Sequence, residues 1–208
     1  KRGDFVAILG HNGSGKSTIA KQINAILEPT EGTLFVNGID VSKEENIWDV
    51  RQSAGMVFQN PDNQIIASVV EEDVAFGPEN IGIPSAEIRK RVDNALAAVG
   101  MSDYATKSMD RMSDGECQRI MIARALAQQT PVIVLDEPTA FLDIPTRHQI
   151  CRLLGELAHH EGKTILFSTH DTDAALPVCD RMAIIENERL TDVPAESANE
   201  RISALFGI

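Results

Sequence analysis

The sequence is poor in aromatic residues, in basic residues and in long apolar runs. Its 208 residues include one tryptophan and one tyrosine, and 31 acidic side chains outnumber 19 basic ones. The net charge of −12 opposes binding to nucleic acid, because such affinity depends on lysine and arginine side chains that neutralise phosphates. It equally disfavours contact with an anionic membrane surface. We therefore expect no nucleic acid partner and no direct attachment to lipid.

No apolar run approaches the length of about 18 residues that a transmembrane helix needs, so the sequence predicts no direct membrane insertion. The three cysteines lack a CxxC spacing and are odd in number. That pattern favours buried thiols in a reducing compartment over disulfides or metal ligands. A hydrophobic content of 43% in 208 residues is enough for one domain with a sizeable core.

The most informative segment spans residues 10–18 and reads GHNGSGKST, which fits the pattern G-x-x-x-x-G-K-[ST]. It follows the apolar run Phe5–Leu9 and precedes a stretch of helical periodicity, Ile19–Leu27, which is the context this motif requires. Glycines let the backbone N–H groups turn toward phosphate oxygens, the lysine reaches the β- and γ-phosphates, and a hydroxyl holds Mg²⁺. The residues expected to bind a nucleoside triphosphate are Gly10, Asn12, Gly13, Ser14, Gly15, Lys16, Ser17 and Thr18.

A second candidate element is the segment 132–137, which reads VIVLDE. Its apolar part is typical of a buried parallel strand, and the two carboxylates follow at the end of that strand. Asp136 is expected to bind Mg²⁺, directly or through water, and Glu137 is expected to polarise the attacking water. On its own, an apolar run that ends in two acids is more often an ordinary strand that leaves the core than part of a catalytic site. The phosphate loop upstream makes the catalytic interpretation the better one.

Further motifs are similar to those of one family. Residues 112–119 read MSDGECQR and resemble the signature LSGGQ-x-QR of ABC ATPases; Gln59 lies in MVFQNP, AFLD follows DEPT at 140–143, and His170 lies in LFSTHD. The chain thus resembles the nucleotide-binding domain of an ABC transporter over almost its whole length. This resemblance implies an α/β fold of the P-loop NTPase (RecA-like) class. Its mostly parallel core sheet would carry an inserted α-helical signature subdomain and a partial antiparallel β region. One ABC ATPase domain would span 1–208, with a core at 1–59 and 112–208 and the helical subdomain at about 60–111.

The resemblance also implies roles for particular residues. Gln59 matches the glutamine that contacts Mg²⁺ and the attacking water, and His170 matches the switch histidine at the γ-phosphate. In this family two domains sandwich two ATP molecules head to tail, so one chain's phosphate loop faces the other chain's signature helix. Catalysis is expected from Lys16, Gln59, Glu137 and His170, metal binding from Ser17, Gln59 and Asp136, and contact with the partner's nucleotide from Ser113, Gly115, Glu116 and Asp143.

The signature departs from the family pattern in its charge. Asp114 and Glu116 stand where the family has glycine and glutamine, so they place negative charge where an anion is expected to dock. Ser113 and Glu116 also have the S-x-x-E spacing of a capping box, which explains both residues without any ligand. Two interpretations therefore stand: a structural helix cap, and a helix N-terminus that faces a γ-phosphate.

Two parts of the chain resemble different subfamilies. Residues 56–101 resemble the ATPases of energy-coupling-factor transporters for vitamins and cobalt, whereas residues 111–208 resemble those of iron-siderophore and haem importers. This difference suggests either a recombinant with a seam near residues 101–111 or an unusual subfamily. About thirty residues that precede the core in the family, including an aromatic that stacks on adenine, are absent before Lys1, and neither Trp48 nor Tyr104 takes that place. We therefore expect a fragment or a truncated version.

The expected function is that of the ATP-binding and ATP-hydrolysing subunit of an ABC importer, with ATP and Mg²⁺ as its cofactors. It would pair with a second ABC ATPase domain, identical or different, and would couple ATP-driven dimerisation to solute transport through a separate transmembrane subunit. Its location would be cytoplasmic, peripheral on the inner face of the cell membrane. One alternative is a soluble ABC ATPase of DNA repair or translation, which the acidity disfavours. The other is a catalytically silent fragment or recombinant.

The remaining sequence predicts alternating strands and helices. The dipeptide Asn37-Gly38, between the short runs 33–36 and 39–41, predicts a hairpin with a type I′ turn. A helix is expected at Ser85–Val99, with its apolar stripe toward the core, and His159 and His160 are expected to be solvated at a helix C-terminus. The other expected elements are strands at 55–58, 164–168 and 182–185 and helices at 145–160 and 172–179.

Overall fold

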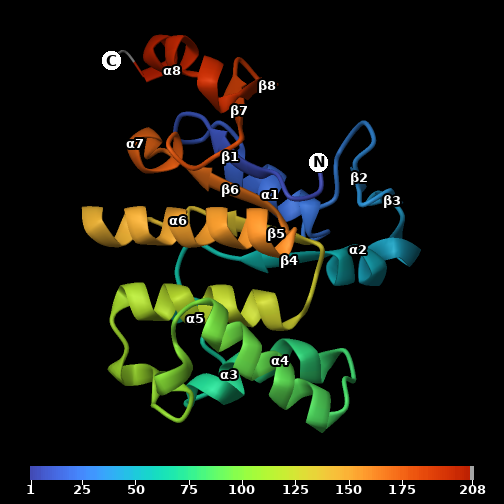
Figure 1. The fold of residues 1–208 in the computed structure, drawn as a ribbon. Coiled ribbons are helices and arrows are strands. Elements are labelled where there is room, and N and C mark those ends of the chain that lie inside the picture. The colour runs from blue at the N-terminus through green and yellow to red at the C-terminus, as the bar shows by residue number, and fades with distance from the viewer. Residues whose placement is uncertain (207–208) are drawn as a thin grey trace.

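A computed structural model describes residues 1–206 and contains a six-stranded sheet (Figure 1). The strand order is β4-β5-β6-β1-β7-β8; the first five strands run parallel, and β8 is antiparallel to β7. Parallel strands buried on both faces explain the nearly continuous apolar runs in the sequence. The strand bounds are β1 Phe5–Leu9, β4 Ala54–Val57, β5 Val132–Asp136, β6 Thr164–Thr169, β7 Arg181–Glu186 and β8 Arg189–Pro194.

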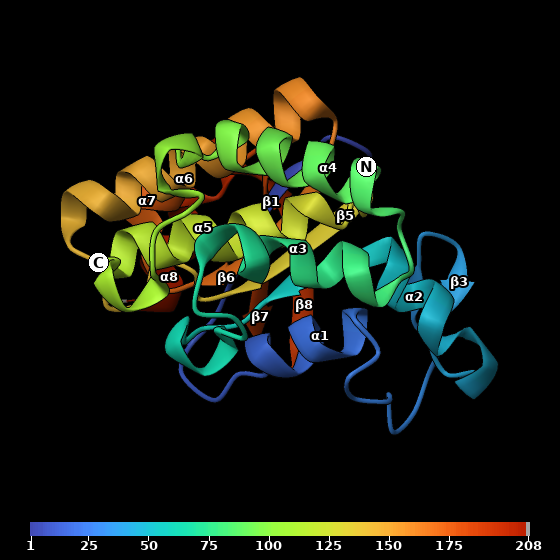
Figure 2. The ribbon, with the colours of Figure 1, turned by 90° about the horizontal axis from the view of Figure 1, so that it is seen from below.

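Helices cover both faces of this sheet. On β5, Val134 packs with residues of helix α1, whereas Ile133 and Leu135 on the opposite face belong to the cluster that includes α5 and α6. Helices α3, α4 and α5 contact one another and form a separate layer, which Figure 2 shows in front of the strands. The helix bounds are α1 Lys16–Ile23, α2 Ile47–Ser53, α3 Val70–Asn80, α4 Ser85–Ala98, α5 Asp114–Ala127, α6 Ile144–Glu161, α7 Thr172–Ala175 and α8 Asn199–Phe206.

The predicted hairpin is confirmed. Strand β2 (Phe35–Val36) pairs antiparallel with β3 (Ile39–Asp40), and the turn residues Asn37 and Gly38 have φ values of 51° and 80°. Two successive positive φ angles are the requirement of a type I′ turn. Helix α4 also begins at the predicted residue, and its stripe residues Val92 and Leu96 are buried.

Several predicted boundaries are wrong. Helix α1 ends at Ile23 rather than near Leu27, because Ala25 takes a positive φ of 53° and turns the chain. The helix expected at 172–179 is regular only to Ala175. His159 is not simply solvated: its Nε2 lies 3.0 Å from Asp180 Oδ2. The elements α2, β8 and α8 were not predicted.

Buried aromatic side chains hold together the strands whose carboxyl ends carry the polar residues of the candidate site. Phe5 of β1 and Phe167 of β6 are fully buried, and their rings stack with centroids 5.0 Å apart. Because β1, β5 and β6 are parallel neighbours, their carboxyl ends lie at one edge of the sheet. Ligands of open α/β sheets bind beyond the carboxyl ends of the strands. None of the helices in the part of the chain that the structure describes combines the length and the apolar character that a bilayer crossing needs.

Candidate functional site

The loop 10–15 joins β1 to α1 and depends on glycine at both of its ends. Gly15 is the N-cap of α1 with φ of 100°, a conformation that residues with a Cβ rarely adopt. At Gly10 a Cβ would lie 2.4 Å from Ser14 Oγ, so the loop closes tightly only with glycine there. Inside the loop the buried Lys16 donates hydrogen bonds to the carbonyl oxygens of Gly10, at 2.9 Å, and His11, at 3.2 Å.

The carboxylate of Asp136 links the end of β5 to the start of α1. Asp136 is buried, and its Oδ1 accepts hydrogen bonds from Ser17 Oγ at 2.9 Å and from Ser168 Oγ at 2.7 Å. The same Ser168 hydroxyl accepts the N–H of Glu137 at 2.8 Å. This arrangement places the Ser17 hydroxyl and the Asp136 carboxylate oxygen side by side at the edge of the sheet.

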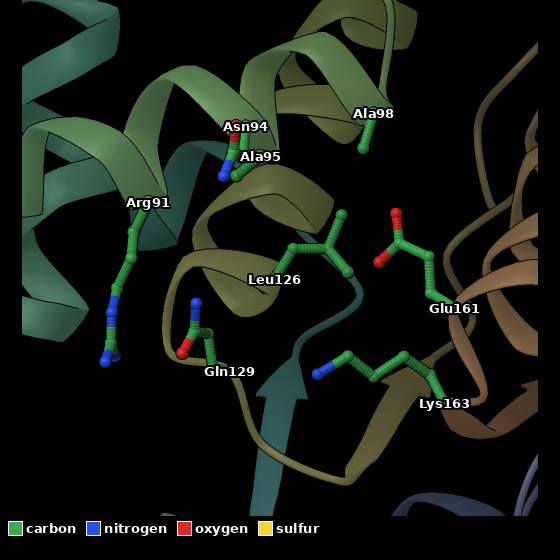
Figure 3. Close-up of a pocket in the computed structure, with 8 residues that line it drawn as sticks. All are labelled: Arg91, Asn94, Ala95, Ala98, Leu126, Gln129, Glu161 and Lys163. Atoms are coloured by element: carbon green, nitrogen blue, oxygen red, sulfur yellow. The ribbon is translucent and has the colours of Figure 1, made fainter. Parts of the chain in front are cut away.

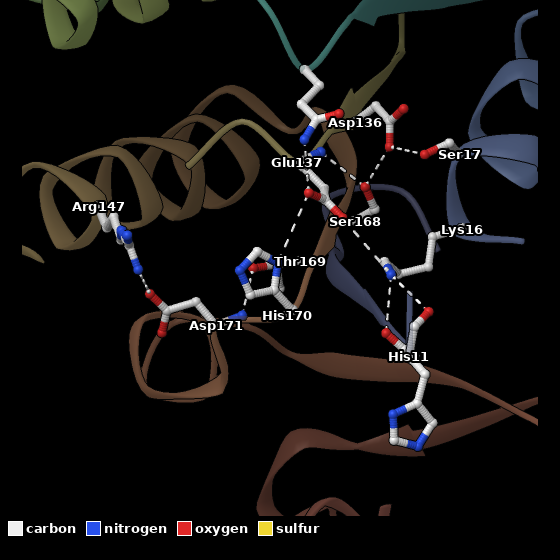
Figure 4. A network of polar contacts seen from close by, with 12 residues as sticks. His11, Lys16, Ser17, Asp136, Glu137, Arg147, Ser168, Thr169, His170 and Asp171 are labelled. Atoms are coloured by element: carbon white, nitrogen blue, oxygen red, sulfur yellow. Dashed lines mark hydrogen bonds and ion pairs between the residues drawn. The ribbon is translucent and has the colours of Figure 1, made fainter. Parts of the chain in front are cut away.

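Glu137 is the point where the polar groups of the site meet (Figure 4). Its Oε2 accepts a hydrogen bond from Gln59 Nε2 at 3.1 Å and lies 3.8 Å from His170 Nδ1, and its Oε1 lies 3.8 Å from Lys16 Nζ. Glu137 has a φ of 47°, which costs a non-glycine residue on the order of 1–2 kcal/mol. Backbone strain of this kind gathers at functional sites.

Most of the residues predicted for catalysis and phosphate binding line one cavity of about 460 Å³. Asp136 lies behind it, bonded to Ser17. The side chain of Ser14 does not line this cavity: it faces a neighbouring space of about 360 Å³ beside the β7–β8 turn. The residues that line the first cavity are Asn12, Gly13, Gly15, Lys16, Ser17, Thr18, Gln59, Glu137 and His170.

The predicted signature residues form a separate group at the N-terminus of α5. Ser113 Oγ accepts the N–H of Glu116 at 3.4 Å, and Glu116 Oε2 accepts the N–H of Ser113 at 2.9 Å, so the predicted capping box is confirmed. Bonds from Ser113 hold the pKa of Glu116 below its usual value, and the Tyr104 hydroxyl adds a further bond. Gly115 lies so close to Thr146 that a Cβ there would come within 2.8 Å of it.

Asp143 lies beside this group as the N-cap of α6. Its Oδ1 accepts the N–H of Thr146 at 2.8 Å, and hydrogen bonds from Thr146 lower the pKa of its carboxyl. The flanking apolar side chains Phe141 and Ile144 are 78% and 68% exposed. Neither Asp143 nor the signature residues line the cavity at Lys16, so this face carries a second, separate set of predicted site residues.

Ser168 was missed by the sequence analysis. It is fully buried and links Asp136 to the backbone of Glu137, although it comes from β6. The one signal was a small polar residue two positions before His170, directly after the apolar run 165–167.

Replacing Ser168 with alanine should lower the free energy of unfolding by about 1–3 kcal/mol, because the variant leaves the N–H of Glu137 without its acceptor and removes one of the two hydroxyl donors to Asp136 Oδ1. Urea unfolding measures the loss. Ser203→Ala, at an exposed position of α8, is the matched control and should change little. An equal effect in the two variants would contradict the structural role of Ser168.

A cavity of about 530 Å³ lies elsewhere, between α4, the end of α5 and the segment after α6 (Figure 3). Its two cations already have partners: Arg91 Nε bonds Glu87 at 3.0 Å, and Lys163 Nζ donates to the carbonyl of Thr130 at 2.8 Å. The carboxylate of Glu161 faces the same space. Paired charges and an added carboxylate leave little to attract an anion, so this cavity carries no assignment.

The geometry defines a class of protein. A glycine-rich loop between a parallel strand and a helix, with a serine hydroxyl on the acid of the next-but-one strand, is the arrangement of a P-loop NTPase. The family model described as ABC transporter matches residues 1–140. The chain belongs to the ABC transporter family and is an ATP-binding, ATP-hydrolysing subunit of that family.

The relatives with high sequence identity carry the name of one group within this family. The chain is 49% identical over 209 residues to "Energy-coupling factor transporter ATP-binding protein EcfA1" of Clostridium perfringens, which covers 99% of this chain and 74% of that protein. The protein of the same name from Symbiobacterium thermophilum is 50% identical, with 99% and 72% covered. Both matches run through residues 101–111, so the energy-coupling-factor resemblance extends well beyond residues 56–101.

Solved structures agree with this fold. The structure of cbiO1 from Clostridium perfringens, part of the ABC transporter complex cbiONQ, has a TM-score of 0.86 and 39% identity and covers 100% of this chain and 89% of that one. The ATP-binding cassette MJ0796, in a dimeric post-hydrolysis state with ADP and Pi, has a TM-score of 0.80 and 31% identity, with 94% and 87% covered. The predicted fold class is therefore confirmed.

Proposed function

We propose that this chain is the ATP-hydrolysing subunit of an importer of the energy-coupling-factor type and drives a separate membrane protein. Relatives of that name match 99% of the chain at 49–50% identity. The observation that carries the proposal is the single cavity in which Lys16, Gln59, Glu137 and His170 meet. Phosphate-binding, water-orienting and proton-accepting groups together are what ATP hydrolysis requires.

The triphosphate is held by the loop at the N-terminus of α1. Backbone N–H groups of the loop and the helix dipole favour an anion at this place. Lys16 is buried and fixed by two carbonyls, so its ammonium group is pre-oriented toward the cavity. An ATP γ-phosphate bound in the cavity would face both this cation and the nearby carboxylate of Glu137.

The site fits Mg²⁺, which prefers oxygen ligands. Ser17 Oγ and Asp136 Oδ1 lie 2.9 Å apart, and the Gln59 amide reaches the same cavity. Among the side chains that the structure describes, no group of three or more histidine, cysteine or acidic residues is suited to a metal. Phosphate oxygens and water would therefore complete the ligand set. When bound, the ion neutralises charge that develops on the phosphates.

Glu137 then acts on the attacking water. Its carboxylate is 16% exposed and bonded to Gln59, so it faces the cavity and holds a defined position. A water between Glu137 and the γ-phosphate can give up its proton to the carboxylate during in-line attack. His170, which is more than half exposed at the rim, contacts the γ-phosphate from the end of β6.

The second half of the site comes from another ATPase domain. Four residues lie outside the Lys16 cavity, at the N-termini of α5 and α6, where they would meet a partner's nucleotide in a head-to-tail dimer: Ser113, Gly115, Glu116 and Asp143. The exposed apolar side chains Phe141 and Ile144 support a protein contact on the same face. The related cassette MJ0796 is a dimer in its solved structures.

Replacing Asp114 with glycine and Glu116 with glutamine should tighten the ATP-dependent dimer, because two negative charges near the partner's γ-phosphate disappear. The bond from the Ser113 N–H to residue 116 becomes weaker when the carboxylate is replaced by an amide, and this opposes the effect by something on the order of 1 kcal/mol. Sedimentation with ATP in a Glu137→Gln background measures the dimer. A weaker dimer would mean that these acids serve the cap alone.

Under this proposal the chain works on the cytoplasmic side of the cell membrane, bound to its membrane partner. Ile66 and Phe76, close to the Gln59 loop and on α3, are 53% and 37% exposed and offer apolar contact for such a partner. Purification of the tagged full-length protein from native membranes tests the proposal. Recovery with an integral membrane protein and ATP turnover by the complex supports it; a protein that is recovered alone and hydrolyses no ATP contradicts it.

A further inference from the structure

The segment 58–67, which joins β4 to α3 and carries Gln59, is fastened by a buried side chain of its own. Gln64 Nε2 donates to the carbonyls of Phe58 at 2.9 Å and Asn60 at 3.0 Å, and its Oε1 accepts the N–H of Phe58 at 3.0 Å. These bonds bracket Gln59 on both sides. The exposed Gln59 thus projects from a loop whose backbone is fixed from behind.

A buried ion pair secures the other end of this segment. Asp73 of α3 is fully buried, and its Oδ1 accepts the N–H groups of Ile66 at 2.7 Å and Ala67 at 3.2 Å. Its Oδ2 lies 3.3 Å from Nη1 of Arg124, which also donates to the carbonyl of Gln64. Arg124 belongs to α5, the helix whose N-terminus is the signature capping box.

Stability alone does not account for this pair. Removing two charges from water costs several kcal/mol per ion, and buried pairs are often replaceable by apolar residues without loss. Burial lowers the pKa of Arg124, which reflects that desolvation cost. What an apolar pair cannot supply is the set of directed bonds to the backbone of 64–67. The charges therefore determine one conformation of the segment.

We propose that Asp73, Arg124 and Gln64 are positioning residues for ATP hydrolysis: they fix the segment 58–67 so that Gln59 reaches Glu137, and they tie that segment to the signature helix. The inference rests on the proposed function. None of the three lines the Lys16 cavity, so they act on the reaction through Gln59. ATP binding, which depends on the phosphate loop, does not involve them.

The test compares Asp73→Asn with Glu71→Gln in the full-length protein. Glu71 is the matched control, since it lies on the same helix and pairs with an arginine, Arg89, but at the surface. Asp73→Asn is expected to lower kcat about tenfold and to leave the Kd for Mg·ATP within about twofold, because only the water-orienting side is disturbed. Glu71→Gln is expected to leave both unchanged.

Repeating Asp73→Asn in a Gln59→Ala background separates positioning from general damage. If Asp73 acts through Gln59, kcat falls no further in the double variant. An equal fall in both backgrounds, a loss of ATP binding, or an unchanged kcat in the single variant would overturn the proposal. Should Asp73→Asn fail to fold, Gln64→Ala, which keeps both charges of the Asp73–Arg124 pair, takes its place with the same expectations. A wild-type protein without any turnover would contradict the proposed function itself.

Discussion

Replacing Glu137 with glutamine is expected to stop ATP turnover while ATP binding persists. The amide has nearly the shape of the carboxylate, so the contacts with Gln59 and Lys16 that shape the cavity change little. It cannot accept a proton from water, and the loss of a general base typically costs about 10²- to 10⁴-fold in rate. Phosphate release gives the rate, and titration calorimetry with Mg·ATP gives the affinity.

The control for this variant is Glu156→Gln, which removes an exposed carboxylate of α6 away from the cavity. Its turnover should equal that of the wild type. Unchanged phosphate release in the Glu137 variant would remove that residue from the mechanism. Loss of ATP binding instead of turnover would show that its main role is to hold Lys16 and the loop.

Lys16→Ala should abolish measurable ATP binding. Among the described residues that line the cavity, Lys16 is the only lysine or arginine, and a charge-assisted bond to a phosphate is among the strongest polar contacts. We expect Kd to rise at least about a hundredfold, or about 2.7 kcal/mol. Titration calorimetry measures it. Lys21→Ala, on the same helix, is the control and should bind as the wild type does.

A folded Lys16→Ala protein that binds Mg·ATP with an unchanged Kd would contradict the assignment of this loop. Circular dichroism of the variant separates that result from unfolding. The distinction is needed because Lys16 also satisfies two carbonyls within the loop, and their loss costs stability.

Local sequence predicts the part of the site that local chemistry determines. The loop 10–18, the acids after β5 and the capping box at Ser113 each depend on residues within a few positions of one another, and the structure places each element as expected. The variants at Lys16 and Glu137 test the roles of these side chains in ATP binding and hydrolysis.

What the sequence could not predict depends on contacts between distant residues. Ser168 bridges two groups more than thirty positions away, and Asp73 and Arg124, which pair across two helices, are 51 positions apart in the sequence. No periodicity marks such partners. The predicted length of helix α1 was too great for a related reason. Ile26 and Leu27 continue an apolar pattern, but the chain has already turned at Ala25.

The most direct test of the account measures phosphate release from ATP by the purified full-length protein over a wide range of protein concentration, with and without Mg²⁺. We expect saturable, Mg²⁺-dependent hydrolysis. Its rate per chain should rise as a second ATPase domain, either another copy or another member of the family, becomes available to complete each site. A rate per chain that stays constant down to the lowest concentration, or an absence of hydrolysis under all of these conditions, would contradict it.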